Sequence, residues 1–280
     1  MRILVTGACG QLGSELINLL CEKGIDNKGI SRDDCDINDT NSLKDIFIEY
    51  RPTCVIHCAA YTNVEKAEVD KENCYNTNVV ATKNIAKLCS EHNCEMVYIS
   101  TDYIFGNDST SPHGINDKKS PLNYYGYTKL CGENEVLETL TKSYIVRTSW
   151  LFGKNGKNFV KTILKLSATK QSIDVVSDQI GSPTYAVDLA EFIIKLLSSH
   201  KYGIYHATNE GFCSFAVFAK KIMKFSRRKT KINFILSKDY NSKACRPLNS
   251  ILSKSSLCSN SFALLPHWEK SLKKFLSEID

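Results

Sequence analysis

Three side chains in the first half of the chain have the types and the spacing of a centre that moves a proton to or from a carbonyl oxygen. Tyr125 and Lys129 are four positions apart and would share one face of a helix. A free phenol has a pKa near 10, and a neighbouring ammonium lowers that pKa towards a range useful for acid–base work. Thr101 ends an apolar run, from which its hydroxyl could bind the same oxygen. An ordinary exposed helix start is the alternative for the Tyr–Lys pair.

A glycine triplet near the N-terminus indicates a nucleotide site. Gly7, Gly10 and Gly13 follow the first apolar run and open a helical pattern. In this setting the first glycine permits a tight turn, the second lets the backbone approach a pyrophosphate, and the third lets helix and strand pack closely. The helix N-terminus adds free N–H groups and a partial positive charge. The triplet therefore predicts dinucleotide binding, with a purely structural turn as the alternative.

The second apolar run ends where such a site meets the adenosine ribose. A carboxylate at this tip would bind the two ribose hydroxyls and repel a 2′-phosphate. This chain has Ser31 and Arg32 there, and the guanidinium could accept that phosphate. NADPH is therefore the predicted cofactor, NADH stays open, and a plain surface charge is the alternative for Arg32. Asp36 is expected beneath the adenine.

The elements that must position these residues alternate between strand and helix patterns. This order predicts an α/β fold, a Rossmann-type doubly wound parallel sheet. We expect residues 1–150 to form the dinucleotide-binding domain and residues 151–280 to form mainly a smaller substrate-binding domain, with parts of about 185–210 returning to the first. The predicted strands are 2–6, 28–31, 53–59, 95–100 and 143–148, and the predicted helices are 11–22, 41–50, 72–92, 125–140 and 187–197. Residues 152–156 and 177–184 are expected to be loops.

Composition narrows the classes of protein. The 12 cysteines are scattered without a C-x-x-C pair, which predicts reduced thiols and no metal site. No run approaches the roughly 20 apolar residues of a membrane helix, nor the apolar core of a secretory signal, so we expect a cytoplasmic protein with no membrane partner. The basic segment 220–231 is expected to be a solvated surface. A rim for an anionic substrate is the alternative, and nucleic acid is disfavoured because no row of aromatic side chains accompanies the charges.

Longer motifs are more specific than the glycine triplet. With them the chain resembles the extended short-chain dehydrogenase/reductases, and within these the dTDP-4-dehydrorhamnose reductases. The motifs that carry the resemblance are Ile3 to Gly13, Asp36-Ile37, Ala59 to Glu68, Asn76 to Asn78, Ser100 to Phe105, Tyr125 to Glu133, Arg147 to Gly153, Asp178 to Thr184 and Arg246 to Ser250.

The resemblance implies a set of contacts and a reaction. The sugar nucleotide would meet Thr101, Asp102 and Trp150, and we expect Arg246 and Asn249 to line the same site. The implied reaction reduces the 4-keto group of dTDP-4-dehydro-β-L-rhamnose to give dTDP-L-rhamnose, with hydride from the nicotinamide and a proton from Tyr125. The implied cofactor contacts are Gly10, Gln11, Leu12, Asp36, Ile37, Ala60, Tyr61, Thr62, Tyr125 and Lys129.

Other interpretations stay open at this point. The non-catalytic regulatory β subunit of methionine adenosyltransferase is similar to these reductases and binds a dinucleotide. Sugar-nucleotide 4,6-dehydratases place Asp-Glu after the threonine, whereas this chain has Asp102-Tyr103. Some members of the family bind magnesium through acidic residues at a subunit contact. Glu15 is present here, but its partners are not recognisable, and no metal is predicted. A homodimer remains open.

Overall fold

Six parallel strands form the central sheet of the computed structural model, which describes residues 1–279. They are β1 (Arg2–Thr6), β2 (Asp26–Ile30), β3 (Cys54–His57), β4 (Glu95–Thr101), β5 (Ser143–Thr148) and β10 (Gly203–His206), in the spatial order β10-β5-β4-β3-β1-β2. The apolar runs of β3 and β5 are buried throughout, as expected for strands covered on both faces. The strand order reverses between β1 and β3, and open parallel sheets bind ligands at the carboxyl ends of such strands.

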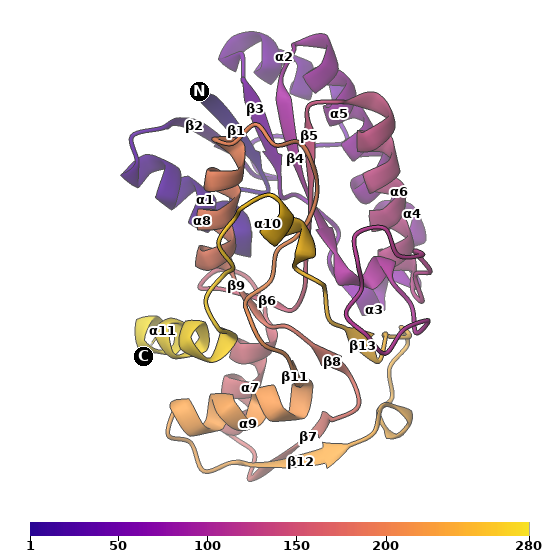
Figure 1. Cartoon of the computed structure of the whole chain (residues 1–280), viewed down its shortest axis with the longest axis vertical. Coiled ribbons are helices and arrows are strands. Elements are labelled where there is room, and N and C mark those ends of the chain that lie inside the picture. The colour runs from indigo at the N-terminus through magenta and orange to yellow at the C-terminus, as the bar shows by residue number, and fades with distance from the viewer. Residues whose placement is uncertain (280) are drawn as a thin grey trace.

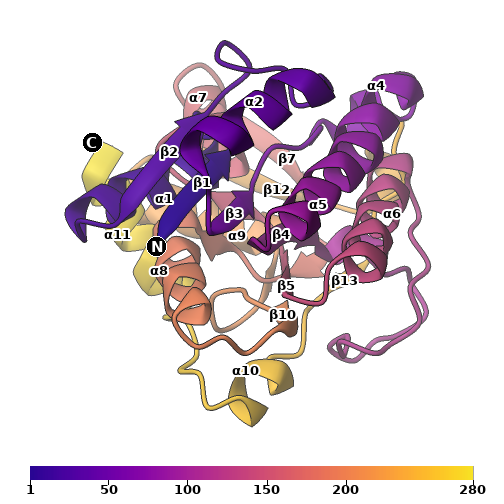
Figure 2. The ribbon, with the colours of Figure 1, turned by 90° about the horizontal axis from the view of Figure 1, so that it is seen from above.

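Helices cover both faces of this sheet (Figure 2). On one face, α1 (Gln11–Glu22) and α8 (Ala186–Leu197) bury Leu16 and Leu189 in a common apolar cluster. On the other face, α2 (Thr40–Tyr50), α5 (Ala81–Glu91) and α6 (Tyr124–Thr139) bury Phe47, Ile85 and Val136. The sequence prediction of an α/β doubly wound parallel sheet is therefore confirmed.

A third apolar cluster belongs to the part of the chain that lies below the carboxyl edge of the sheet, in the lower half of Figure 1. The helices α7 (Phe159–Ser167), α9 (Phe215–Phe225) and α11 (Trp268–Ile279) surround it, together with the parallel pair β7 (Ser172–Val176) and β12 (Lys231–Ile235). Two further short sheets join this part to the central sheet. They are formed by β6 (Leu151–Phe152) with β9 (Thr184–Tyr185), and by β11 (Cys213–Ser214), β8 (Ile180–Gly181) and β13 (Asn249–Ser250).

The remaining short elements are helical. They are α3 (Val64–Ala67), α4 (Lys71–Tyr75), the π-helical turn η1 (Asn76–Val80), the 3-10 turns η2 (Asp102–Ile104) and η3 (Ser237–Asp239), and α10 (Ser255–Ser259). Within residues 1–279 there is no helix with both the length and the apolar character needed to cross a membrane.

The structure differs from the sequence predictions at several places, and the third strand, predicted over 53–59, is limited to Cys54–His57. The helix expected over 72–92 consists of α4, the turn η1 and α5, because the chain is wound with one extra residue per turn at Asn76–Val80. The expected loops 152–156 and 177–184 contain residues of the short strands β6, β8 and β9. The second strand begins at Asp26, two residues earlier than predicted, since its pairing with β1 starts opposite Arg2.

Candidate active site

The glycine loop between β1 and α1 has the shape of a phosphate cradle. Gly7 has φ +66°, and a Cβ there would lie 2.7 Å from the backbone nitrogen of Ala59. A Cβ on Gly13 would lie 2.2 Å from the Gly7 carbonyl oxygen, so only glycine allows this contact between helix and loop. Gly10 is the N-cap residue of α1, and it has no side chain that could accept a hydrogen bond from the first turn. The N–H groups of Gln11 and Leu12 are therefore free at the helix start. This loop fits a pyrophosphate.

The tip of β2 holds a carboxylate that the sequence analysis did not place there. The Asp34 Oδ2 atom accepts hydrogen bonds from the Ser31 backbone N–H at 2.8 Å and from the Ser31 hydroxyl at 2.6 Å. These bonds lower the pKa of Asp34, so the group is ionised at neutral pH. The tip is joined to the glycine loop because the Ala8 N–H donates to the Ile30 carbonyl.

The other residues expected at the adenosine end lie on two segments beside this tip. The Asp36 carboxylate accepts from the backbone N–H of Asn38 at 3.0 Å, which fixes the turn that also carries Ile37. Arg32 is exposed. Burial raises the pKa of the Tyr61 phenol to about 12, and the positive charge of Arg32 opposes this rise. The turn after β2 and the loop after β3 therefore approach one another here.

Residues 60–62, which follow β3, are held by Asn78, which belongs to one of the sequence motifs but had no role assigned from the sequence. The Asn78 Oδ1 atom accepts from the Tyr61 N–H at 2.9 Å, and the Asn78 Nδ2 atom donates to the Tyr61 carbonyl at 3.2 Å and to the Thr128 hydroxyl at 3.0 Å. Asn78 lies in the π-helical turn η1, and such turns often occur at functional sites. It joins the loop that carries Ala60, Tyr61 and Thr62 to α6.

The first turn of α6 brings Tyr125 to the end of β4. Asn123 caps this helix because its side-chain oxygen accepts from the Gly126 N–H at 2.8 Å. A Cβ at Gly126 would lie 2.1 Å from the Tyr103 carbonyl oxygen, so glycine is needed for this close approach. The Tyr103 and Tyr125 rings meet edge to face with their centroids 6.1 Å apart. Tyr125 and the residues after Thr101 are thus packed together.

The Tyr125 phenol is governed by burial in this structure. Burial raises the pKa of Tyr125 well above its ordinary value, and the adjacent Thr101 hydroxyl opposes the rise. Lys129 was expected to lower this pKa, but burial is the largest influence and the net shift is upward. The phenol is protonated at neutral pH, which is the form that donates a proton.

Lys129 is almost fully buried, one helical turn beyond Tyr125. Its Nζ atom lies 4.0 Å from the centroid of the Tyr98 ring, a cation–π arrangement. Burial lowers the pKa of Lys129 to about 7, although the charge of Glu133 acts in the opposite direction. The amine therefore exchanges its proton in the physiological range.

Asp102, beside Thr101, is a buried acid with one unpartnered oxygen. Its Oδ1 atom accepts from the Thr101 hydroxyl at 3.0 Å, whereas Oδ2 is buried without a hydrogen-bond partner. Burial raises the pKa of Asp102 to about 7, against the opposing influence of the nearby Ser250 and Thr101 side chains. An orphaned buried oxygen next to Thr101 fits a group that receives a polar atom of a ligand.

A buried ion pair supports these residues from behind. Arg147 binds both carboxylate oxygens of Glu133, at 2.9 Å through Nε and at 2.7 Å through Nη2. The Glu133 carboxylate also accepts from the Ser100 hydroxyl at 2.5 Å. Glu133 is on α6 with Tyr125, Arg147 is on β5, and Ser100 is on β4. The pair therefore fixes α6 against the two strands whose ends form the site.

Trp150 follows β5 and has an unusual backbone. Its φ of +47° lies in the left-handed region, which is costly for a residue with a side chain and is frequent at ligand sites. The indole stacks on Phe215 with the ring centroids 3.6 Å apart, and a Cβ at Gly181 would lie 2.6 Å from the indole. These contacts from α9 and β8 fix the ring orientation.

Arg246 and Asn249, expected near the substrate, bind protein groups. Arg246 forms an ion pair with Glu65 at 2.6 Å and lies beside the Tyr103 phenol. The Asn249 amide donates to the carbonyls of Ser109 and Ser111, at 3.1 and 2.8 Å. Both side chains thus hold the walls of the site together.

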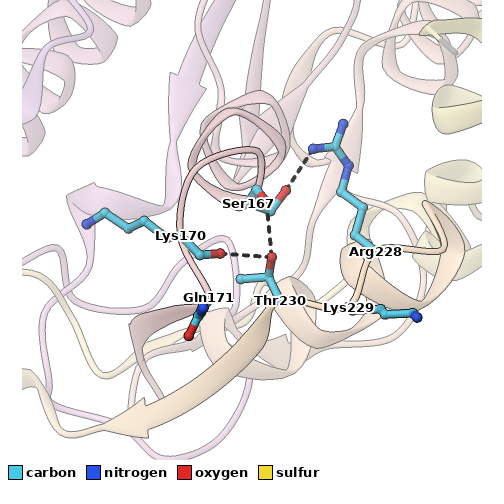
Figure 3. A pocket seen from close by; sticks show the side chains of 6 residues that line it. All are labelled: Ser167, Lys170, Gln171, Arg228, Lys229 and Thr230. Carbon is cyan, nitrogen blue, oxygen red and sulfur yellow. Dashed lines mark hydrogen bonds between the residues drawn. The ribbon is translucent and has the colours of Figure 1, made fainter.

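The basic segment 220–231 contributes to a surface cavity in the lower part of the molecule (Figure 3). This cavity of about 440 Å³ is lined by Ser167, Lys170, Gln171, Arg228, Lys229 and Thr230. Arg228 donates to the Leu164 carbonyl and to the Ser167 hydroxyl, both at 2.9 Å. The guanidinium therefore caps the end of α7.

Comparison with known proteins extends over the whole chain. The family described as RmlD substrate binding domain matches residues 1–280. The spore coat polysaccharide biosynthesis protein SpsK of Bacillus subtilis is 40% identical over 278 residues, which cover 99% of this chain and 97% of that protein. The dTDP-4-dehydrorhamnose reductase of Aggregatibacter actinomycetemcomitans is 36% identical over 286 residues, which cover 97% of each chain.

A solved structure matches equally well. The crystal structure of dTDP-4-dehydrorhamnose reductase from Bacillus anthracis, in complex with NADP, superimposes with a TM-score of 0.96, is 39% identical, and covers 99% of both chains. The chain therefore belongs to the RmlD family of dTDP-4-dehydrorhamnose reductases, as its motifs predicted.

Proposed function

We propose that this protein reduces the 4-keto group of dTDP-4-dehydro-β-L-rhamnose to give dTDP-L-rhamnose, with NADPH as the reductant. The observation that carries the proposal is the Thr101 hydroxyl beside Tyr125 at the carboxyl edge of the sheet, with the buried Lys129 one turn further along α6 and a glycine loop that fits a pyrophosphate. Family membership supports both the reaction and the cofactor.

Several groups of this chain would hold the cofactor. The free N–H groups of Gln11 and Leu12 would bind the pyrophosphate, and Arg32 would bind the 2′-phosphate. Residues 60–62, fastened by Asn78, would border the adenosine and ribose. Lys129 would bind a ribose hydroxyl. When bound, the reduced nicotinamide supplies the hydride that reaches C4 of the sugar.

Tyr125 would complete the reduction at the other end of the carbonyl bond. As the new C–H bond forms at C4, electron density moves to the C4 oxygen, and the Tyr125 hydroxyl gives that oxygen its proton. The raised pKa of Tyr125 keeps the phenol protonated and ready for this step. The Thr101 hydroxyl would hydrogen-bond the same oxygen and stabilise its developing charge.

The proton on Tyr125 must be restored before the next turnover. Lys129, with a pKa of about 7, can exchange a proton with solvent at neutral pH. We propose that Lys129 returns a proton to Tyr125, since the two residues share one helix face. Lys129 would then serve both proton supply and cofactor binding.

Trp150 and Asp102 are proposed to contact the sugar nucleotide. The stacked indole offers an N–H donor, and the unpartnered Asp102 Oδ2 atom offers a hydrogen-bonding position beside Thr101.

We propose that residues 151–280, apart from α8 and β10, form the substrate-binding part of the protein. We propose that the protein acts in the cytosol, where free thiols are stable. We also propose that it can form a homodimer.

A direct assay tests the proposal. The purified protein is mixed with NADPH and dTDP-4-dehydro-β-L-rhamnose, NADPH oxidation is followed by absorbance, and the sugar product is identified by mass spectrometry and NMR. Stoichiometric formation of dTDP-L-rhamnose is the expected result. Tight NADPH binding without turnover would instead place the protein with the non-catalytic regulatory subunits.

A further inference from the structure

A short segment from the C-terminal half crosses to the part of the molecule that holds Tyr125. Residues 242–246, called the strap here, lie between η3 and β13 and run beside α3 (Figure 1). The strap is far in sequence from its contacts: the Ser242 hydroxyl, which donates to Glu65 at 2.7 Å, is separated from it by 177 residues. Because the strap has no regular secondary structure, its position depends on side-chain contacts of this kind.

The Glu65 carboxylate is the centre of these contacts. Besides the Ser242 hydroxyl, it accepts from the backbone N–H groups of Lys243 at 2.8 Å and Ala244 at 3.3 Å. The Arg246 guanidinium lies 2.6 Å from its Oε1 atom. Although burial opposes it, hydrogen bonds from Ser242 and Arg246 lower the pKa of Glu65 to about 2. The carboxylate is therefore ionised at neutral and mildly acidic pH.

The strap also contacts two parts of the reaction centre. The Asn123 Nδ2 atom donates to the Cys245 carbonyl at 2.8 Å, while Oδ1 of the same side chain caps α6 at Gly126, next to Tyr125. Arg246 lies beside the phenol of Tyr103, whose ring packs against Tyr125. Asn123 thus joins the strap to α6, the helix that carries Tyr125. Arg246 joins the strap to the segment that follows Thr101.

We propose that Glu65 is a positioning residue that seats the strap, and that the seated strap fixes the first turn of α6 and so the place of the Tyr125 hydroxyl relative to Thr101. Glu65 closely follows residues 60–62, so the same carboxylate links the cofactor side of the site to its substrate side. The proposal rests on the proposed function, and it adds a residue that acts on the reaction through other groups.

The test compares Glu65→Gln with Glu72→Gln, which removes an exposed carboxylate from the nearby helix α4. The glutamine amide cannot accept from three donors and faces the Arg246 charge, so the strap should open more often. Trypsin should then cut after Lys243 at least about tenfold faster in Glu65→Gln, because proteolysis follows the population of the open form. Mass spectrometry of the fragments measures this rate without reference to catalysis.

Turnover provides the second measurement. We expect Glu65→Gln to lower kcat/KM for the sugar nucleotide by roughly 10- to 100-fold, since small misplacements of reacting groups have effects of this size. The Kd of NADPH and the thermal midpoint should match those of Glu72→Gln. Ser242→Ala, which removes one donor, should show the same pattern more weakly, and it replaces Glu65→Gln if that variant does not fold.

Three results would overturn the proposal. Equal cleavage of Glu65→Gln and Glu72→Gln would show that Glu65 does not hold the strap. Faster cleavage with unchanged turnover would show that the strap does not position the reaction centre. An equal loss of NADPH binding and turnover would assign Glu65 to the cofactor site instead. If the wild-type protein shows no turnover, the proposed function is wrong. This outcome differs from a failure of the strap proposal, because the trypsin cleavage rates are measured independently of turnover.

Discussion

The Asp34 carboxylate occupies the tip of β2 by accepting two hydrogen bonds from Ser31, one from the backbone N–H at 2.8 Å and one from the hydroxyl at 2.6 Å. This is the end of the strand where the adenosine ribose of a dinucleotide lies. The tip therefore combines an acid, Asp34, which favours free ribose hydroxyls, with a cation, Arg32, which favours a 2′-phosphate. The two side chains should act in opposite directions on the choice between NADH and NADPH.

We predict that Asp34→Ala raises the ratio of kcat/KM with NADPH to kcat/KM with NADH by up to about tenfold, because the carboxylate repels a 2′-phosphate through solvent that screens part of the interaction. Arg32→Ala should lower the same ratio by up to about tenfold through loss of a charge-assisted contact. Asp33→Ala, with the same charge change as Asp34→Ala, is the control. A ratio that does not differ between the two aspartate variants would remove Asp34 from cofactor selection.

The buried Glu133–Arg147 pair gives a prediction about stability. Glu133→Ala leaves Arg147, which is 1% exposed, without its carboxylate, and should lower the free energy of unfolding by roughly 3–5 kcal/mol. The double variant Glu133→Leu with Arg147→Met removes both charges and should be more stable than Glu133→Ala. Urea unfolding followed by circular dichroism measures both. A double variant less stable than the single one would contradict this account of the pair.

Asp102 gives a prediction about pH. Its pKa rises from an unfolded value near 4 to about 7 in the folded protein, so the folded state binds more protons between these values. The stability that this group contributes is present below about pH 4 and is lost as the pH rises to about 7. Asp102→Asn cannot titrate and therefore does not lose this stability. The thermal midpoint of Asp102→Asn minus that of the wild type should therefore increase between about pH 4 and about pH 7.

The size of this effect follows from the shift. Three pKa units correspond to about 4 kcal/mol, an upper limit because the amide introduced by Asp102→Asn would also have an unpartnered polar atom. Asp239→Asn, an exposed aspartate in η3, serves as the control. If the difference in thermal midpoint between Asp102→Asn and the wild type stays constant across the pH range, Asp102 titrates in the folded protein as it does in the unfolded chain.

Trp150 should matter for the substrate more than for the fold. Phenylalanine keeps an aromatic ring on Phe215 but removes the indole N–H, so Trp150→Phe should raise KM for the sugar nucleotide by about tenfold, the value of one hydrogen bond of about 1.4 kcal/mol. Trp268→Phe, in the apolar cluster around α11, should lower the thermal midpoint and leave KM unchanged. Unchanged kinetics in a folded Trp150→Phe protein would make Trp150 a packing residue only.

Sequence reasoning was most successful where one segment determines its own structure. The bounds of β1, α1 and β5 agree with the predicted ranges, because an apolar run or a 3.6-residue periodicity is complete within each. The residue types of the reaction centre were readable for the same reason, since the Tyr125–Lys129 spacing needs only one helix.

The missed features depend on segments that are distant in sequence. The Glu65 contacts with Ser242 and Arg246 join residues that no local pattern connects, so these contacts could not be predicted. Asn78 is aimed at Tyr61 by a π-helical turn, which hydrophobic periodicity does not reveal. The upward shift of the Tyr125 pKa depends on burial, which is complete only after the fold has closed around the phenol.

The final prediction concerns the proton-transfer step. Tyr125→Phe removes only the hydroxyl of a packed ring, so the fold should persist while kcat falls by about 10²- to 10⁴-fold, the usual contribution of a general acid. The Kd of NADPH should change little, because the glycine loop is untouched. Thr101→Val should also lower kcat with nearly intact cofactor binding. Stopped-flow turnover and fluorescence titration with NADPH provide the two measurements.

Lys129→Met separates the two roles assigned to this lysine. It should lower kcat by interrupting proton resupply, and it should weaken NADPH binding by removing a ribose contact, so both measured quantities change together. Lys87→Met, on the exposed side of α5, is the matched control and should change neither. If Lys129→Met weakens NADPH binding but has the wild-type kcat at saturating cofactor, Lys129 is a binding residue only, and Tyr125 must regain its proton from solvent by another route.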